Sequence, residues 1–339
     1  MTAKQHSGRN ILLFLVVLLV ASGFFILRQE DSQSKVEGYF AYVANTEDGT
    51  ITVIDTTLDE PLKVIEVDES VSDGLAASMS QRRIYVGNGN QGVLSVIDGD
   101  SGQVVEEINL ERRIHGIDLS PEGRFLYLTS GALEENEEYN YIMVYDTHTK
   151  SQAGEILSGS NSPSHISFNS DGTLAFATNV MSGDLSVIDT ASQEIIRTIP
   201  VGQVPNEGKT DPAGERFFVA SLMENELRVI DLASGDEIAR LPAGEGTHGV
   251  AVAEDGGSVW TANRFSGDVT VFDAQNYRLL ATIEIKGMPN HVFQVPDMDK
   301  MYVSSLESNE IAVIDMNSLE VIKRIPVGSK PHEIGFIPK

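Results

Sequence analysis

The sequence predicts an all-β fold, a seven-bladed β-propeller of four-stranded blades, from three observations. A Val-x-Asp triplet recurs seven times, at spacings of 43, 48, 43, 42, 42 and 42 residues. Each interval holds several short β-branched runs between turn clusters and no helical stripe. The last interval stops after one strand, Glu333 to Ile337, whereas residues 39–67 supply three strands without a first. We therefore expect the N- and C-terminal strands to share one blade, which closes the ring without a free sheet edge.

Two positions that recur in the repeat support the prediction of each blade. An aromatic residue marks the second strand, at Tyr42, Tyr85, Tyr127, Phe176, Phe218, Trp260 and Tyr302. An aspartate ends the third strand, at Asp55, Asp98, Asp146, Asp189, Asp231, Asp273 and Asp315. We expect these carboxylates to accept hydrogen bonds from backbone N–H groups of the following turn. A linear solenoid of the same units is the alternative, but it would expose sheet edges and lack atypical capping repeats.

The first 28 residues are predicted to be a targeting segment outside the fold. Lys4 and Arg9 precede an apolar run over residues 11–27, which contains the small-residue sequence Ala21-Ser22-Gly23. A cleaved signal peptide and a retained signal anchor both fit this pattern. Either one exports the chain, so we expect a periplasmic or extracytoplasmic protein with residues 29–38 as linker and residues 39–339 as propeller. If the segment is retained, residues 11–27 anchor the protein to the inner membrane.

The composition excludes several classes of function. The chain has 339 residues, with 24 Lys and Arg against 50 Asp and Glu, and it has no cysteine. A net charge of -26 disfavours binding to a nucleic-acid backbone or an anionic lipid surface and favours cations and basic proteins. Without cysteine there is no disulfide, thiolate metal site, covalently attached c-type haem or cysteine nucleophile.

Four segments of the repeat resemble a known family. They are Tyr42-Val43-Ala44-Asn45, Tyr85-Val86-Gly87-Asn88, Phe176-Ala177-Thr178-Asn179 and Trp260-Thr261-Ala262-Asn263. These segments look like the YVTN repeat, and the Val-Ile-Asp triplets and residues 248–256 resemble its other parts. The resemblance covers residues 39–338 and implies an extracytoplasmic seven-bladed propeller of the YncE-like group, akin to the haem d1 domain of periplasmic nitrite reductases. This repeat hosts binding modules, redox accessory proteins and a few lactonase-like enzymes, so the resemblance implies a fold rather than a function.

Five of the seven histidines fall at one repeated locus, the start of the first strand of each blade. The residue pairs there are Asp73-Gly74, His115-Gly116, Ser164-His165, Asn206-Glu207, His248-Gly249, Asn290-His291 and His332-Glu333. Because the innermost strand of a blade borders the channel, we expect these residues to ring one exposed channel mouth. Imidazole is a common metal ligand, and Glu207, Glu333 and Asp73 add carboxylates. The hypothesis is a site for a transition metal (Cu, Zn or Fe) or a haem-type tetrapyrrole. The alternative is that the histidines only brace neighbouring loops.

Two further features are expected beside this mouth. The insertion at residues 131–140 carries four glutamates, which indicates a solvated acidic loop, with cation capture or docking of a basic protein as alternatives. Arg112, Arg113 and Lys330 lie in adjoining connections. They could bind the carboxylates of a ligand or cofactor, or simply balance local charge.

The sequence lacks three common catalytic and phosphate-binding motifs. There is no Gly-x-Ser-x-Gly elbow, phosphate loop or His-Glu-x-x-His. We therefore expect a non-catalytic module that binds a ligand, a metal or a periplasmic or cell-surface protein. Such a module could be an accessory to a periplasmic redox system. The alternative is an enzyme that uses the histidine-bearing mouth, either a haem d1-dependent oxidoreductase or a metal-dependent, lactonase-like hydrolase.

Overall fold

The computed structural model describes residues 37–67, 71–88, 91–131, 140–159 and 162–339. Within these ranges no helix is long and apolar enough to cross a membrane. The predicted targeting segment over residues 1–28 lies outside the described residues, as do residues 132–139 with the four glutamates of the insertion.

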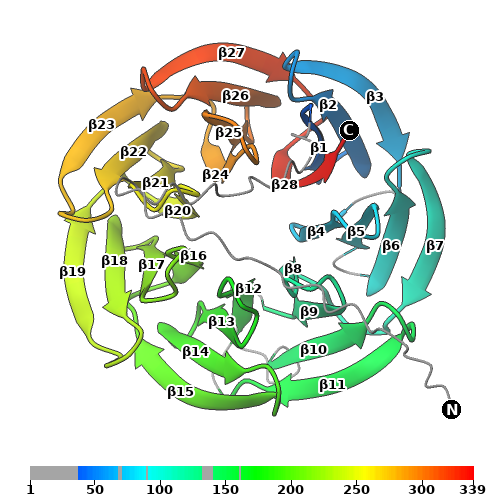
Figure 1. Ribbon diagram of the computed structural model, residues 1–339, viewed down its shortest axis with the longest axis horizontal. Coiled ribbons are helices and arrows are strands. Elements are labelled where there is room, and N and C mark those ends of the chain that lie inside the picture. Colours follow the sequence, from blue (N-terminus) through cyan, green and yellow to red (C-terminus); the bar gives the residue numbers. More distant parts are fainter. Residues whose placement is uncertain (1–36, 68–70, 89–90, 132–139, 160–161) are drawn as a thin grey trace, which may run out of the picture. The chain divides into compact units, whose positions relative to one another are not determined.

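The described chain forms seven four-stranded antiparallel sheets arranged as blades in a ring (Figure 1). From the innermost strand outward, blade 1 is β4 (Leu75–Ser78), β5 (Arg83–Asn88), β6 (Val93–Asp98) and β7 (Gln103–Asn109), and blade 2 is β8 (Ile117–Leu119), β9 (Phe125–Thr129), β10 (Tyr141–Asp146) and β11 (Ser151–Leu157). Blade 3 is β12 (Pro163–Phe168), β13 (Leu174–Asn179), β14 (Asp184–Asp189) and β15 (Glu194–Pro200). Blade 4 is β16 (Pro205–Thr210), β17 (Arg216–Ser221), β18 (Glu226–Asp231) and β19 (Glu237–Pro242). Blade 5 is β20 (Thr247–Val252), β21 (Ser258–Asn263), β22 (Asp268–Asp273) and β23 (Leu279–Glu284). Blade 6 is β24 (Pro289–Gln294), β25 (Lys300–Ser305), β26 (Glu310–Asp315) and β27 (Glu320–Pro326), and blade 7 is β28 (Pro331–Pro338), β1 (Tyr39–Asn45), β2 (Thr50–Asp55) and β3 (Glu60–Glu66).

The position of each strand in its blade explains its residue pattern. The two middle strands are covered on both faces by neighbouring blades, so their central residues form nearly continuous apolar runs, as in β26. The outermost strands alternate between exposed and partly buried residues, as in β7, because only one face packs against a neighbour. The sequence pattern thus specifies both the strand and its radial place in the blade.

The hydrophobic core consists of apolar clusters between adjacent blades. Val271 of blade 5 and Val303 of blade 6, for example, belong to one buried cluster. Tyr302 of blade 6 and Val43 of blade 7 belong to the next, and Val53 of blade 7 and Ile84 of blade 1 to a third. Four similar clusters lie between the remaining blade pairs of the described chain. Every blade is therefore held by both of its neighbours.

The two ends of the described chain meet in blade 7. The C-terminal strand β28 pairs antiparallel with β1, and Tyr39 lies opposite Pro338. The backbone N–H of Lys339 also donates to the carbonyl of Gly38 at 3.0 Å. Strands from opposite ends of the sequence therefore form a single sheet.

The repeated aspartates have the structural role that the sequence predicts. Oδ1 of Asp55 accepts the backbone N–H groups of Thr57 and Leu58, at 2.8 and 3.2 Å. The same bonding to the following turn is made by the other six aspartates, Asp98, Asp146, Asp189, Asp231, Asp273 and Asp315. This prediction is confirmed, and it leaves these carboxylates out of the candidate functional residues.

Candidate functional site

Irregular pairing at the start of the innermost strands brings the predicted locus into the channel. The pairing register with the neighbouring strand shifts once in each of β12, β16, β20, β24 and β28. The residues that lie at these shifts are 164–165, 206–207, 248, 290–291 and 332–333. Neighbouring residues of a regular strand point to opposite faces, but the extra residue of a β-bulge breaks that alternation. Two consecutive side chains, such as His332 and Glu333, can therefore both face the channel.

The locus forms two layers of side chains, and each layer lines its own cavity. The mouth layer consists of Asp73, His115, Ser164, Asn206, His248, Asn290 and His332, and the inner layer of His165, Glu207, His291 and Glu333. Most of the mouth layer lines a cavity of about 250 Å³, the mouth cavity, together with side chains of the turns that follow β13, β17 and β21. A second cavity of about 200 Å³, the inner cavity, is lined by His165, Glu207 and Glu333. His165 lines both cavities and so lies between them.

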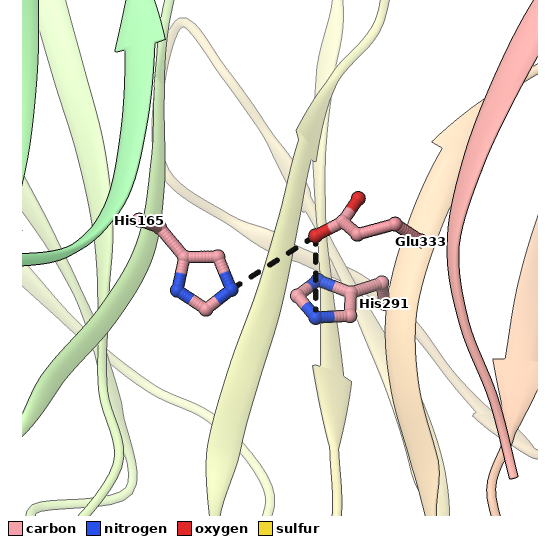
Figure 2. A group of neighbouring side chains, drawn as sticks. All are labelled: His165, His291 and Glu333. Carbon is pink, nitrogen blue, oxygen red and sulfur yellow. Dashed lines mark ion pairs between the residues drawn. The ribbon is translucent and has the colours of Figure 1, made fainter. Parts of the chain in front are cut away.

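The carboxylates and imidazoles of the inner layer contact one another in a continuous series, which begins at Lys209. Nζ of Lys209 lies 3.1 Å from Oε1 of Glu207, and Oε2 of Glu207 lies 2.9 Å from Nδ1 of His291. Oε1 of Glu333 then lies 3.5 Å from Nε2 of His291 and 3.9 Å from Nε2 of His165 (Figure 2). Residues from blades 3, 4, 6 and 7 thus converge on one point of the channel.

The histidines of the mouth layer face either the carboxylate of Asp73 or a backbone carbonyl group. Oδ2 of Asp73 lies 3.5 Å from Nδ1 of His115, and its Oδ1 lies 3.6 Å from Nε2 of His332. Nδ1 of His248 lies 3.1 Å from the carbonyl oxygen of Asn290. An imidazole that donates one N–H to such an acceptor presents the lone pair of its other nitrogen.

The histidines are more deeply buried than the sequence analysis expected. The exposed fraction is 8% for His165, 2% for His248, 0% for His291 and 4% for His332. The channel is narrow here, and the ring centroids of His291 and His332 lie 4.6 Å apart. The expectation of an exposed ring of histidines is therefore wrong, because the imidazoles themselves fill the channel.

Burial and mutual charge set the protonation of the inner layer. Burial raises the pKa of Glu333, and the charges of Glu207 and Asp118 raise it further. Burial opposes protonation of His291, but the charges of Glu333 and Glu207 outweigh it and raise its pKa. Lys209 and His291 together hold the pKa of Glu207 well below its usual range despite burial. The crowding of buried carboxylates therefore favours proton uptake by both His291 and Glu333.

The other buried histidines are neutral. Burial lowers the pKa of His332 to about 3, and it also lowers the pKa values of His165 and His248 well below 6.5. Neutral imidazole is the form that binds metal ions. His165 is therefore already in its ligand form at neutral pH.

Three side chains of the inner layer place possible metal-ligand atoms close together. Single ligand atoms of His165, His291 and Glu333 all lie within 4.8 Å of one another. Donor atoms around a tetrahedral zinc ion lie about 3.3 Å apart, so small side-chain shifts close the site. Nε2 of His291 is buried without a hydrogen-bond partner, while Nδ1 of the same ring faces Glu207. A carboxylate behind a histidine ligand is the common outer shell of zinc sites.

The predicted cationic ligands lie elsewhere. Arg112 pairs with Glu155 at 3.2 Å, and its guanidinium lies over the ring of Tyr141. Lys330 pairs with Glu47 at 3.7 Å. Neither of these residues, nor Arg113, is among the described residues that line the two cavities. The structure therefore brings the predicted histidines and glutamates together but not the predicted basic residues.

Three charged residues of the site were missed in the sequence. Asp118 and Lys209 line the inner cavity from β8 and β16, and Arg264 lines the mouth cavity from the turn after β21. Asp118 and Lys209 share one position of the repeat, three residues after the start of the locus, where the other blades carry uncharged residues. A charged residue at an otherwise uncharged position of an innermost strand is thus the sequence feature that indicates Asp118 and Lys209 as site residues. Arg264 replaces an aliphatic or small residue of the repeat.

Comparisons with known proteins identify the repeat and the fold. A family model described as YNCE-like beta-propeller matches residues 41–338. No curated protein is similar enough to match. Hydrazine synthase of Kuenenia stuttgartiensis has a similar structure, with a TM-score of 0.71 and 19% identity over 86% of this chain and 99% of that one.

A second similar structure is described as dihydro-heme d1 dehydrogenase NirN in complex with DHE. Its TM-score is 0.62, and the identity is 18% over 85% of this chain. The match spans 63% of the NirN chain. At these identities both structures support the fold alone.

Proposed function

The chain belongs to the YNCE-like β-propeller family, and from its channel we propose that it is a metal-binding module that holds a divalent transition metal ion in the inner layer. The observation that carries the proposal is the convergence of His165, His291 and Glu333. Two imidazoles and a carboxylate suit zinc, copper or iron. Glu207 would orient His291 from behind, at 2.9 Å from its Nδ1.

The charge of the site supports a cation as its occupant. Glu207, Glu333 and Asp118 all line the inner cavity, and Lys209 is the one lysine beside them among the described lining residues. The raised pKa of Glu333 reflects this crowding of carboxylates in a buried place. A metal ion would compete with protons for His291 and Glu333, because both groups bind a metal in their deprotonated forms.

Metal titration tests the proposal directly. We expect chelator-stripped protein to bind one Zn²⁺ or Cu²⁺ ion per chain in calorimetry, and His291→Gln and Glu333→Gln to lose that binding. His148→Gln is the matched control, because His148 is exposed and outside the cluster, and it should keep the wild-type isotherm. Identical isotherms for wild type and His291→Gln would refute the site.

A haem-type tetrapyrrole fits the described channel poorly. The mouth cavity of about 250 Å³ is smaller than the roughly 300–1,000 Å³ of pockets for drug-sized ligands. Arg112 and Lys330, the expected partners of cofactor carboxylates, pair with Glu155 and Glu47 instead. The described cavity and its neighbouring cations therefore favour a metal ion over a haem-type tetrapyrrole.

A metal-dependent hydrolase is the second candidate function. Burial raises the pKa of Asp118 to about 6, and Asp118 lines the inner cavity beside His165 and Glu333. A carboxyl group that titrates near neutrality suits proton transfer, and three protein ligands leave a fourth position for water. Chelator-sensitive hydrolysis of nitrophenyl acetate by zinc-loaded protein, reduced in Asp118→Asn, would favour this candidate. Hydrolysis at the rate of buffer alone would favour the binding module.

We further propose that the propeller acts outside the cytoplasm, as an accessory or scaffold of a redox or cell-surface complex. The support is the basic and then apolar sequence of residues 1–28. Cell fractionation with antibody detection tests this proposal. Recovery of the protein from the cytoplasmic fraction would refute it.

A further inference from the structure

The mouth cavity has two chemically different walls. Its apolar wall consists of Val180, Val204, Leu222 and Met223, from the turn after β13, the start of β16 and the turn after β17. The polar part of the lining carries both a cation and an anion, Arg264 and Asp73, together with histidines of the mouth layer. A cavity of this kind suits a ligand that is itself part apolar and part charged.

The apolar wall continues onto the rim as a departure from the repeat. Met181, Met223 and Phe265 occupy the same turn position in blades 3, 4 and 5, and they are 38%, 59% and 61% exposed. Glu47 and Glu307 occupy this position in blades 7 and 6. Large exposed apolar side chains gathered beside a cavity are typical of ligand-binding surfaces.

The positive charge of Arg264 is only partly neutralised by its neighbours. Its Nε donates to the side-chain oxygen of Asn290, which is a neutral acceptor. Burial lowers its pKa to about 10, because the charge of Asp73 compensates the burial only in part. Asp73 is shared with His115 and His332, at 3.5 and 3.6 Å. An arginine in this state favours a carboxylate, which it can bind through two N–H groups.

Two buried acceptors in the same cavity have no hydrogen-bond partner. They are Oδ1 of Asn206, a residue 8% exposed, and Nδ1 of His332, a residue 4% exposed. Nε2 of His332 lies 3.6 Å from the carboxylate of Asp73, which favours the tautomer with its proton on Nε2 and leaves Nδ1 as an acceptor. A buried acceptor without a donor is unfavourable unless a water or a ligand satisfies it.

From these observations we propose that the mouth cavity binds a small zwitterion with an apolar body, of the class of the apolar α-amino acids. The carboxylate would bind Arg264, and the ammonium group would donate to Asp73, Asn206 and His332. The apolar side chain would pack against Leu222 and Met223. The site differs from the inner-layer metal site, and the proposal does not depend on a bound metal.

A ligand series on the wild-type protein in chelator-containing buffer tests the proposal. We expect L-leucine to give a saturable calorimetric isotherm. Leucinamide, which lacks the carboxylate, 4-methylpentanoate, which lacks the ammonium group, and glycine, which lacks the apolar body, should each bind at least about tenfold more weakly. Absence of leucine binding, or equal binding of all four compounds, would overturn the proposal.

Matched variants locate the site. Arg264→Gln and Met223→Ser should each weaken leucine binding at least about tenfold. Arg240→Gln and Ile196→Ser should not, because Arg240 is paired with Glu237 and Ile196 is 58% exposed on the outermost strand β15. Thermal melting checks that each variant is folded. Unchanged leucine binding in folded Arg264→Gln would overturn the assignment.

Discussion

Glu207 contacts three groups of the channel wall at once. Its Oε2 accepts the backbone N–H of Val250 at 2.9 Å and faces Nδ1 of His291 at the same distance. Its Oε1 pairs with Lys209 at 3.1 Å. These contacts come from three different blades, so the orientation of one imidazole depends on the whole channel wall.

Replacement of Glu207 tests this positioning role. We expect Glu207→Gln to weaken metal binding by roughly 10–100-fold, because the proton on Nδ1 of His291 loses its anionic acceptor. Calorimetry with Zn²⁺ measures the change. Glu310→Gln is the control, since Glu310 pairs with Arg324 on the outer part of blade 6. Equal affinities of Glu207→Gln and wild type would show that Glu207 does not position the ligand.

The pKa values predict how metal affinity depends on pH. The pKa of Glu333 is raised to about 7, and that of His291 is also raised. Both groups must lose a proton to bind a metal, so affinity should rise with pH from about 5.5 to about 8.5. Calorimetry in buffers of different ionisation enthalpy should detect released protons near neutral pH. A pH-independent affinity over this range would contradict the assignment of these ligands.

Among the structural elements, the innermost strands determine the site. Gly74, Gly116 and Gly249 occupy the inner-layer position in the three blades that lack a large side chain there. A Cβ on Gly249 would lie 2.5 Å from the carbonyl oxygen of Asn290 and 2.6 Å from Cα of His291. Close approach of the strand in blade 6 therefore requires glycine in blade 5.

Gly249→Ala tests this packing. We expect a loss of about 1–3 kcal/mol in the free energy of unfolding, because the added methyl group has no space. Metal affinity should fall too, because His291 must move. Gly257→Ala in the same blade is the control, since its added Cβ would meet only the side chain of Asp255, at 3.1 Å. Wild-type stability and metal affinity in Gly249→Ala would show that the strands can separate without cost.

The innermost strands also show why the site was only partly predictable. The repeat placed five histidines at one radial position, and that much follows from spacing. Which adjacent residue faces the channel depends on the register shifts in five of the innermost strands, and the spacing of the repeat does not reveal these shifts. Burial was missed for a related reason, because the channel width depends on the close packing of strands from all seven blades.

For the whole molecule, repetition made the architecture predictable. One unit occurs seven times in the sequence, and this repetition predicts the number of strands, the number of blades and the role of the aspartates in the turns. Lys209 and Asp118 were overlooked because each occurs in one blade only, and their meaning depends on side chains from other blades. Arg112 and Lys330 were assigned to the mouth from chain position, whereas ion pairs with Glu155 and Glu47 hold them.

The pairing of β28 with β1 makes ring closure testable at the scale of the molecule. Deletion of residues 331–339 removes the innermost strand of blade 7, with its buried side chains Ile334 and Phe336, and so uncovers the apolar faces of blades 1 and 6 that pack against it. We expect the truncated protein to lose its cooperative thermal transition, because each interface needs both blades. A circular permutant with residues 330–339 joined ahead of residue 37 is the control. Since the backbone of Lys339 already meets Gly38 at 3.0 Å, a short linker should restore the strand and the transition. A truncated protein that still melts cooperatively near the wild-type temperature would show that β28 is not required to close the ring.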